Sequence, residues 1–383
     1  MNAFALTVDR DASGQERSSW KLVRSEAGNT WDPAAKEWPA ENVTGFISYD
    51  YKNKLEALST SFPDDSGFPG FFFLDSEHPE YFGSDLHSAI NACATNTTER
   101  GHVKLQCLIT KEEYLKKVGN IKDHILRGDI YELNFCQKFE AWNTVIDPAR
   151  VFSRLYERSH APFAALMKAG PCYFIGASPE RFLMKKGRTL LSQPMKGTAP
   201  RGETQVKDDQ EMENLALNEK ERSENIMITD LVRNDLSRIA KKASVSVSEL
   251  CRVYRFKNVH QMISSISCEL RSGVSFTDIL QATFPMGSMT GAPKISAMRL
   301  IDRYEGTGRG LYSGAFGSIS SSGDLDLSVA IRSIFYNEQK KYLSFMVGSA
   351  ITAGSEPERE YEECMLKAKT MIEALDVDFR KFA

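Results

Sequence analysis

Apolar residues between positions 110 and 128 recur at intervals close to the 3.6-residue turn of an α-helix. They are Tyr114, Val118, Ile121 and Ile125. A Thr-x-x-Glu capping box at Thr110 precedes them and Gly128 follows them, and these are typical start and stop signals of a helix. The pattern therefore predicts a helix between these two positions.

The rest of the chain mixes strand-like and helix-like patterns. Alternation of apolar and polar residues predicts strands over 131–139, 162–167 and 173–176, and β-hairpins over 310–354. Helical periodicity returns in 204–240 and 356–374. Because these elements do not follow strict βαβ alternation, they indicate an α+β fold. We expect a small β-rich region packed on the core in residues 1–105 and the main, catalytic domain in residues 106–383.

Composition excludes several classes of function. The 383 residues include 48 Lys and Arg against 51 Asp and Glu, which leaves a formal net charge of −3 at pH 7. A dedicated nucleic-acid binder would carry a strong basic excess. The seven cysteines lack metal-like spacing, and neither a signal peptide nor an apolar run long enough for a membrane span is present. We therefore expect a cytoplasmic protein that binds neither nucleic acid nor membrane.

Two helical segments carry glutamates at i, i+3 spacing, Glu221 with Glu224 and Glu360 with Glu363. This spacing places both carboxylates of a pair on one face of a helix. If the two helices face each other, their oxygens suit Mg²⁺, which takes one or two carboxylates directly and is supported by others. Two solvated acidic faces would give the same pattern, so spacing alone leaves both interpretations open.

Two further residues are candidates for catalysis. Lys196 stands between a strand-like segment and a run rich in Gly and Pro, where a lysine can meet a ligand. A nucleophilic role requires a lowered ammonium pKa, from burial or from a nearby cation; the alternative is a solvated loop lysine. Glu180 follows an apolar strand and a Pro-bounded turn, which suits a general acid or base. Its alternative role is an ion pair with Arg181 or Arg201.

The segment 284–294, FPMGSMTGAPK, combines glycines, prolines and hydroxyl residues ahead of a predicted helix. Its backbone N–H groups and the helix N-terminus are suited to holding an anion. The segment lacks the residue order of a nucleotide-binding P-loop, so we do not expect an ATPase.

Seven segments occur together in a specific order: GASPERF, QPMKGT, ERSENIMITDLVRNDLSR, FPMGSMTGAPK, YSGAFG, AIRS and EREYEECMLKAK. In this combination, over roughly residues 110–375, the chain resembles the chorismate-binding enzymes, whose members form anthranilate, aminodeoxychorismate, isochorismate or salicylate. The resemblance implies a large mixed αββα sandwich with two β-sheets and outer helices. It also implies that the glutamate pairs form a Mg²⁺ site.

The lysine ahead of Gly-Thr separates members of this family. Anthranilate-forming members carry Ala at the position of Lys196, whereas P-x-K-G-T is typical of aminodeoxychorismate-forming ones. The resemblance implies that Lys196 attacks ring position 2 of chorismate while the hydroxyl at position 4 leaves, with Glu180 as the acid. Ammonia from a separate glutamine amidotransferase subunit then adds at position 4. Component I of an anthranilate-forming synthase is the alternative.

The resemblance also implies the ligand contacts. Mg²⁺ would hold the ring carboxylate through Glu224 and Glu363, supported by Glu221 and Glu360. The enolpyruvyl carboxylate and the ring would contact Tyr312, Arg332, Lys367, backbone N–H groups near Gly348, and Thr198. Among the departures from the family pattern, Glu132 replaces a usual Gln and Gln261 stands where a His is expected. These two residues leave open a non-catalytic protein that keeps the site only as structure.

Overall fold

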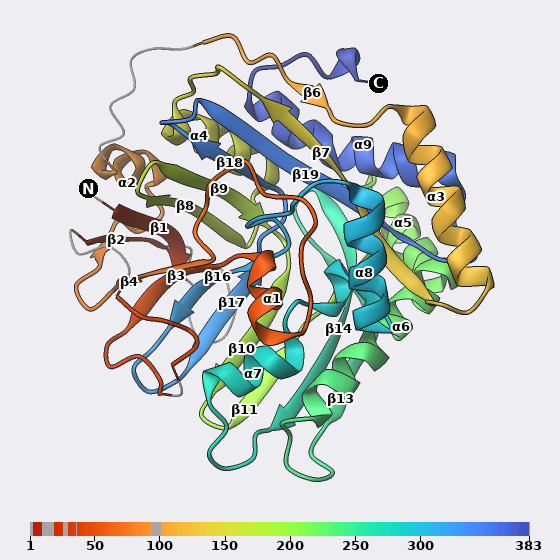
Figure 1. The fold of residues 1–383 in the computed structure, drawn as a ribbon, viewed down its shortest axis with the longest axis horizontal. Helices are drawn as coiled ribbons and strands as arrows, with labels where there is room; N and C mark the ends of the chain where they lie inside the picture. Colours follow the sequence, from red (N-terminus) through yellow and green to blue (C-terminus); the bar gives the residue numbers. More distant parts are fainter. Residues whose placement is uncertain (1–2, 10–18, 26–29, 36, 94–100, 383) are drawn as a thin grey trace.

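The structure is a computed structural model that describes residues 3–9, 19–25, 30–35, 37–93 and 101–382. Two antiparallel β-sheets form its centre, and helices cover their outer faces (Figure 1). The predicted α+β class and the αββα sandwich are confirmed by this arrangement.

The first sheet contains ten strands. They are β1 (Ala3–Asp9), β2 (Ser19–Ser25), β5 (Glu80–Tyr81), β6 (Gln106–Cys107), β7 (Glu132–Ala141), β8 (Phe163–Ala169), β9 (Cys172–Ser178), β15 (Gly291–Ala292), β18 (Ser333–Asn337) and β19 (Tyr342–Ile351). Their order is β15-β7-β19-β18-β9-β8-β1-β2-β5, and β6 also pairs with β7.

The second sheet contains nine strands. They are β3 (Val43–Ile47), β4 (Phe71–Asp75), β10 (Arg181–Lys186), β11 (Thr189–Ser192), β12 (Met195–Pro200), β13 (Ser246–Arg255), β14 (Val259–Glu269), β16 (Ala315–Ile319) and β17 (Leu325–Val329). Their order is β12-β14-β11-β10-β17-β16-β3-β4, and β13 also pairs with β14.

The described α-helices are α1 (Lys52–Leu55), α2 (Leu86–Ala92), α3 (Lys111–Leu126), α4 (Pro148–Ser159), α5 (Gln205–Leu217), α6 (Glu219–Ser237), α7 (Phe276–Thr283), α8 (Lys294–Glu305) and α9 (Pro357–Ala374). Short 3₁₀ turns are η1 (Tyr49–Tyr51), η2 (Gly287–Met289) and η3 (Phe379–Lys381). Helices α3, α4 and α9 pack on the first sheet, and α5 and α6 pack on the second. The two sheets therefore carry separate helical layers.

Strand β9 shows how sequence alternation builds these layers. Phe174 points towards the second sheet, where its ring centroid lies 4.8 Å from that of Phe316 on β16. Its neighbours Tyr173 and Ile175 belong to the other hydrophobic cluster, which includes buried residues of α3, α4 and α9. Successive side chains of a strand face opposite sides, so one apolar strand supplies both cores.

The helix predicted from Thr110 is confirmed as α3. The Thr110 hydroxyl accepts a hydrogen bond from the Glu113 amide at 3.2 Å, and the Glu113 carboxylate accepts one from the Thr110 amide at 2.9 Å. The charged region 204–240 forms two helices, because the Asn218 side chain caps α6 by accepting a hydrogen bond from the Glu221 amide. That cap marks the start of the helix that carries the first glutamate pair.

Residues 1–105 take part in both sheets. Strands β1, β2 and β5 extend the first sheet, and β3 and β4 extend the second. The segment expected to pack on the core as a small region therefore shares its sheets with the rest of the chain, and the boundary at residue 105 stays a prediction.

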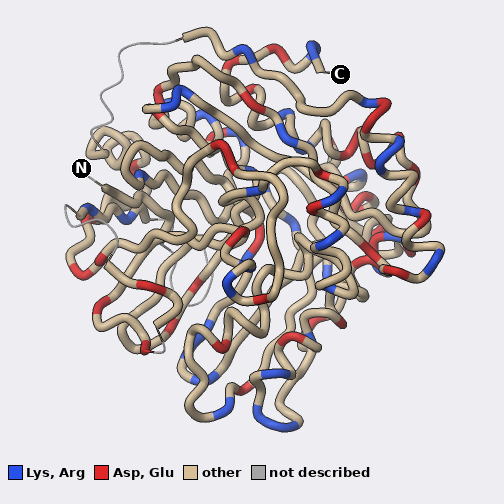
Figure 2. Tube along the Cα trace, in the orientation of Figure 1, with Lys and Arg blue, Asp and Glu red and all other residues tan. Residues whose placement is uncertain are grey.

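Acidic and basic residues are interspersed along the described Cα trace, as Figure 2 shows. This distribution agrees with the near-balance of charge in the sequence. Among the helices that the described residues form, none has both the length and the hydropathy needed to cross a bilayer.

Candidate active site

The two glutamate pairs lie on α6 and α9, and a lysine links the helices. Lys220 of α6 donates a hydrogen bond to the Glu360 carboxylate of α9 at 3.0 Å, and its ammonium lies 3.8 Å from Glu224 on its own helix. Glu360 and Glu224 are buried, whereas the Glu363 side chain is 44% exposed. The pairs thus face a shared region, with chain cations among the carboxylates.

Burial and repulsion from neighbouring carboxylates raise the pKa of both Glu224 and Glu221. Burial raises the pKa of Glu224 to about 7, against the attraction of Lys196 and Lys220. Burial also raises the pKa of Glu221, and the nearby charge of Glu363 adds to this effect. A bound cation would relieve this unfavourable concentration of negative charge.

The four carboxylates do not form a tight ligand cluster. Within the described ranges, the one group whose three acidic side chains lie within 4.8 Å of one another is Glu41, Asp75 and Glu77, which is remote in sequence from both pairs. The buried Oε1 atom of Glu224 nevertheless has no hydrogen-bond partner. An orphaned carboxylate oxygen among other hard oxygen donors fits a divalent cation such as Mg²⁺.

Lys196 lies on β12 with only 11% of its side chain exposed, so it is not the solvated loop lysine of the alternative interpretation. Its ammonium is 3.2 Å from the Oε1 atom of Glu132 on β7. Burial favours the neutral amine, but Glu132 and Glu224 outweigh it and hold the pKa of Lys196 well above its usual range. The pKa shift is opposite to the one a nucleophile requires, so the neighbouring carboxylates keep Lys196 protonated.

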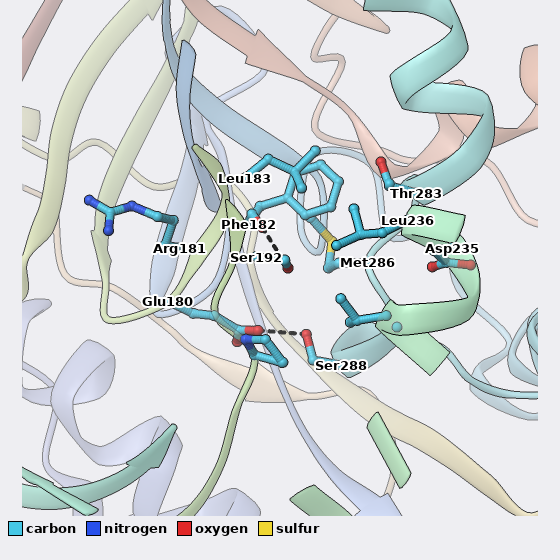
Figure 3. A pocket seen from close by; sticks show the side chains of 13 residues that line it. Glu180, Arg181, Phe182, Leu183, Ser192, Asp235, Leu236, Thr283, Met286 and Ser288 are labelled. Atoms are coloured by element: carbon cyan, nitrogen blue, oxygen red, sulfur yellow. Dashed lines mark hydrogen bonds between the residues drawn. The ribbon is translucent and has the colours of Figure 1, made fainter. Parts of the chain in front are cut away.

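Glu180 is buried in the turn between β9 and β10 and faces Ser288 of the 284–294 segment (Figure 3). The Ser288 hydroxyl donates a hydrogen bond to its Oε1 atom at 2.6 Å. Burial raises the pKa of Glu180 to about 7, although Ser288 and Lys196 favour the anion. Its predicted alternative partners are engaged elsewhere, since Arg181 pairs with Asp326 and Arg201 with Asp208.

A small internal cavity lies behind Glu180, bounded by Ser288 on one side and Asp235 on another (Figure 3). Its free volume of about 20 Å³ holds roughly one water molecule. Pockets for small-molecule ligands are typically at least about 300 Å³, so this cavity is not the substrate site.

Four of the residues expected to contact substrate, namely Tyr312, Arg332, Gly348 and Lys367, form a connected group around β19. Lys367 donates a hydrogen bond to the carbonyl of Gly348 at 2.8 Å and lies 2.5 Å from Glu363. Arg332 donates to the Lys367 carbonyl at 3.5 Å and holds a left-handed φ of 51°. Such a conformation is uncommon outside glycine and is often found at functional sites.

Gly348 lies opposite Cys136 of β7, and any side chain at 348 would collide with the Cys136 sulfur. That sulfur also contacts the hydroxyl of the buried Tyr312 at 3.6 Å. The close approach explains why the strand carries glycine at this position. Tyr312 and Gly348 are therefore linked through one buried thiol.

Thr198 is exposed on β12, two residues beyond Lys196. Its hydroxyl donates to Gln261 at 2.9 Å, and the Gln261 amide donates to the Gly197 carbonyl at 2.8 Å. Gln261 therefore orders the strand segment after the lysine. His260 is fully buried and contacts Asp208 at 2.9 Å, which places it in the packing of α5 against β14.

Three neighbours of the predicted residues were not among the expected site residues, namely Glu132, Ser288 and Lys220. Ser288 lies in the segment predicted to bind an anion, and the structure directs its hydroxyl to a carboxyl group of the chain instead. Lys220 precedes Glu224 by four residues, which is a common spacing for an ion pair on a helix. Glu132 was visible only as a departure from the family pattern.

Proteins of similar sequence identify the family to which this chain belongs. The family model described as chorismate binding enzyme matches residues 4–373. The aminodeoxychorismate synthase of Streptomyces griseus is 40% identical over 289 residues, which are 75% of this chain and 38% of that protein. Anthranilate synthase component 1 of Thermus thermophilus is 30% identical over 361 residues, covering 88% of this chain and 77% of the relative.

The chain spans about half the length, or less, of several of these curated relatives. It covers 48% of the chloroplastic anthranilate synthase alpha subunit 1 of Arabidopsis thaliana, at 34% identity over 285 residues. Among solved structures, anthranilate synthase component I from Streptococcus pneumoniae superposes with a TM-score of 0.75 at 24% identity, over 96% of this chain and 89% of that one. At that identity the likeness concerns the fold. By the family match and the relatives together, this chain belongs to the chorismate-binding enzymes.

Proposed function

We propose that the protein is an aminodeoxychorismate synthase component I, which replaces the 4-hydroxyl of chorismate with an amine in the cytoplasm. The product would serve the synthesis of 4-aminobenzoate and folate. The observation that carries this proposal is the burial of Lys196 among carboxylates, near the carboxyl of Glu180. The name of the Streptomyces griseus relative, which has the highest identity quoted above, supports it further.

The proposed reaction begins when the neutral amine of Lys196 attacks ring position 2. The electron pairs shift through the ring and the hydroxyl at position 4 leaves as water, taking a proton from Glu180, because hydroxide is a poor leaving group. Ammonia then adds at position 4 and the bond between the ring and Lys196 breaks. The enolpyruvyl ether survives, and the ammonia nitrogen returns a proton to Glu180.

Chorismate carries two carboxylates that require positive charge. Arg332 and Lys367 would supply it on the enolpyruvyl side, with Tyr312 and the backbone near Gly348 shaping the wall of the site. Thr198 would contact the reacting face. Fixed positioning of the ring relative to Lys196 contributes much of the rate gain expected for such a displacement.

Glu224 and Glu363 would hold Mg²⁺, supported by Glu221 and Glu360. When bound, the ion supplies positive charge for the ring carboxylate. Lys220 and Lys367 neutralise part of the same acidic group through ion pairs with Glu360 and Glu363.

A Glu224→Gln variant is expected to raise the Mg²⁺ concentration for half-maximal activity by at least about tenfold, because a buried ligand oxygen is lost. Mg²⁺ should raise the melting temperature of the wild type and have little effect on that of the variant. Glu219→Gln, an exposed glutamate on the same helix, is the matched control. Equal stabilisation of wild type and Glu224→Gln by Mg²⁺ would remove Glu224 from the ligand set.

The pKa of about 7 for Glu180 predicts a pH dependence. Because Glu180 acts as a proton donor, kcat should fall as pH rises through about 7, where the carboxyl loses its proton. Ser288→Ala removes a hydrogen bond that stabilises the carboxylate, so the pKa should rise and the fall should move to higher pH. Glu180→Gln should lower kcat roughly 10²–10⁴-fold and abolish the fall of kcat with rising pH. If the fall persists in Glu180→Gln, a group other than Glu180 causes it.

The direct test is incubation of the purified chain with chorismate, Mg²⁺ and ammonium, followed by mass identification of the product. Aminodeoxychorismate supports the proposal. Anthranilate with release of pyruvate would instead identify anthranilate synthase component I, the second candidate, which the Thermus thermophilus relative favours. In the cell a glutamine amidotransferase subunit would supply ammonia. No conversion of chorismate would indicate a non-catalytic protein.

A further inference from the structure

A buried carboxylate that the proposed reaction does not use lies against its nucleophile. Glu132 is only 1% exposed, and its Oε1 atom is 3.2 Å from the ammonium of Lys196. Its Oε2 atom is also buried and has no hydrogen-bond partner. We propose that Glu132 is the base that takes the proton from Lys196 before the attack and returns it when the lysine leaves. This inference rests on the proposed function.

Several carboxylates face Lys196 from the surrounding elements. They are Glu132 on β7, Glu221 and Glu224 on α6, Glu363 on α9, and Glu180 in the turn between β9 and β10. Two further ammonium groups, those of Lys220 and Lys367, lie among them. In the described part of the chain, Glu132 is the carboxylate within ion-pair distance of the Lys196 ammonium.

The other carboxylates have competing tasks. Glu221, Glu224 and Glu363 belong to the proposed metal site, so their lone pairs would be drawn towards a cation. Glu180 must carry a proton to expel the hydroxyl and cannot accept one at the same moment. Glu132 has no such task, and its partnerless Oε2 lacks the donors that normally stabilise a buried anion. Proton transfer within the pair removes both buried charges together.

The proton balance closes over one turnover. An N–H bond of Lys196 breaks and an O–H bond forms on Glu132, which leaves the nitrogen lone pair free to form the bond to ring carbon 2. Water departs from carbon 4 with the proton of Glu180. When ammonia has bonded to carbon 4, Lys196 leaves as a neutral amine and recovers its proton from Glu132. The ammonia nitrogen reprotonates Glu180.

A base and a merely electrostatic partner predict opposite effects of Glu132→Gln. The amide removes the negative charge and keeps the shape, so more of Lys196 is a free amine at neutral pH. If Glu132 only held the lysine charged, the variant would be as active as wild type or more active. If Glu132 accepts the proton, the variant loses activity although its lysine is more often neutral.

The experiment combines turnover with labelling of Lys196. Glu132→Gln is expected to lower kcat for aminodeoxychorismate formation at least about 10²-fold at pH 7.5, with a much smaller change in KM. Labelling of the Lys196 amine by an amine-directed reagent, read by peptide mass across pH, should shift to lower pH in the variant. Glu140→Gln is the matched control, because Glu140 is a buried carboxylate on the same strand whose partners are Gln106, Trp142 and Tyr342. That control should retain wild-type turnover and labelling.

Undiminished kcat in Glu132→Gln, or unshifted labelling, overturns the base role while wild-type product formation keeps the proposed function. A wild-type chain that forms no aminodeoxychorismate overturns both. If Glu132→Gln does not fold, Glu132→Asp decides, since its shorter side chain draws the carboxylate away from the Lys196 ammonium and should lower kcat. Wild-type kcat in Glu132→Asp would contradict the inference.

Discussion

Replacement of Lys196 with alanine is expected to lower aminodeoxychorismate formation on the order of 10³-fold or more, because the covalent step loses its nucleophile. The buried cluster around this lysine contains at least three carboxylates that act on its charge. The measurement is product formation from chorismate, Mg²⁺ and ammonium, quantified by mass. A small amount of anthranilate from Lys196→Ala would identify the lysine as the switch between products.

The control for this variant is Lys207→Ala. Lys207 follows Lys196 closely in the sequence, on α5, but its side chain is 63% exposed. This control should leave turnover unchanged. Intact-protein mass after rapid quenching should show a covalent adduct in the wild type and none in Lys196→Ala. Undiminished aminodeoxychorismate formation by Lys196→Ala would refute the nucleophilic role.

Replacement of Arg309 with methionine is expected to destabilise the fold by about 3–5 kcal/mol, because it leaves a buried carboxylate without its partner. Arg309 and Glu305 are each 1% exposed and form two hydrogen bonds, at 2.6 and 2.9 Å. The guanidinium also donates to the carbonyls of Met289 and Asn134. It therefore ties the 284–294 segment, which carries Ser288, to strand β7.

Denaturant unfolding of the purified variant measures this effect. Arg303→Met is the control, because Arg303 is exposed on the last turn of the same helix as Glu305 and should change stability by less than about 0.5 kcal/mol. A double variant with Glu305→Met should recover part of the loss, since the uncompensated charge is gone. Full recovery is not expected, because Glu305 also accepts a hydrogen bond from the Cys136 amide. An Arg309→Met variant as stable as wild type would show that the pair is not a structural anchor.

Local signals in the sequence were sufficient to predict several helices and strands. The capping box at Thr110 and the apolar spacing after it depend on residues within one or two helical turns, so α3 could be predicted. The same holds for the placement of both glutamate pairs on helices and for the alternation that became β9. These features are set by contacts between residues close in sequence.

The geometry and the protonation of the candidate site depend on contacts between residues that are distant in sequence. Lys196 meets Glu132 across 64 positions of sequence, Glu180 meets Ser288 across 108, and Lys220 meets Glu360 across 140. Each contact requires particular strands and helices to pack together, and no local pattern specifies that packing. A nucleophilic Lys196 requires a lowered pKa, but folding places the carboxylate of Glu132 on β7 beside its ammonium and raises that pKa.

The family, the α+β class and the residue types available for chemistry could be predicted without a structure, because motif order and periodicity are properties of the chain. The packed fold was needed to show that nearby carboxylates raise the pKa of Lys196 and that burial raises the pKa of Glu180 to about 7. Charge states in a protein interior follow from burial and from the charges that folding brings near, and both arise only when the two sheets and their helices have packed.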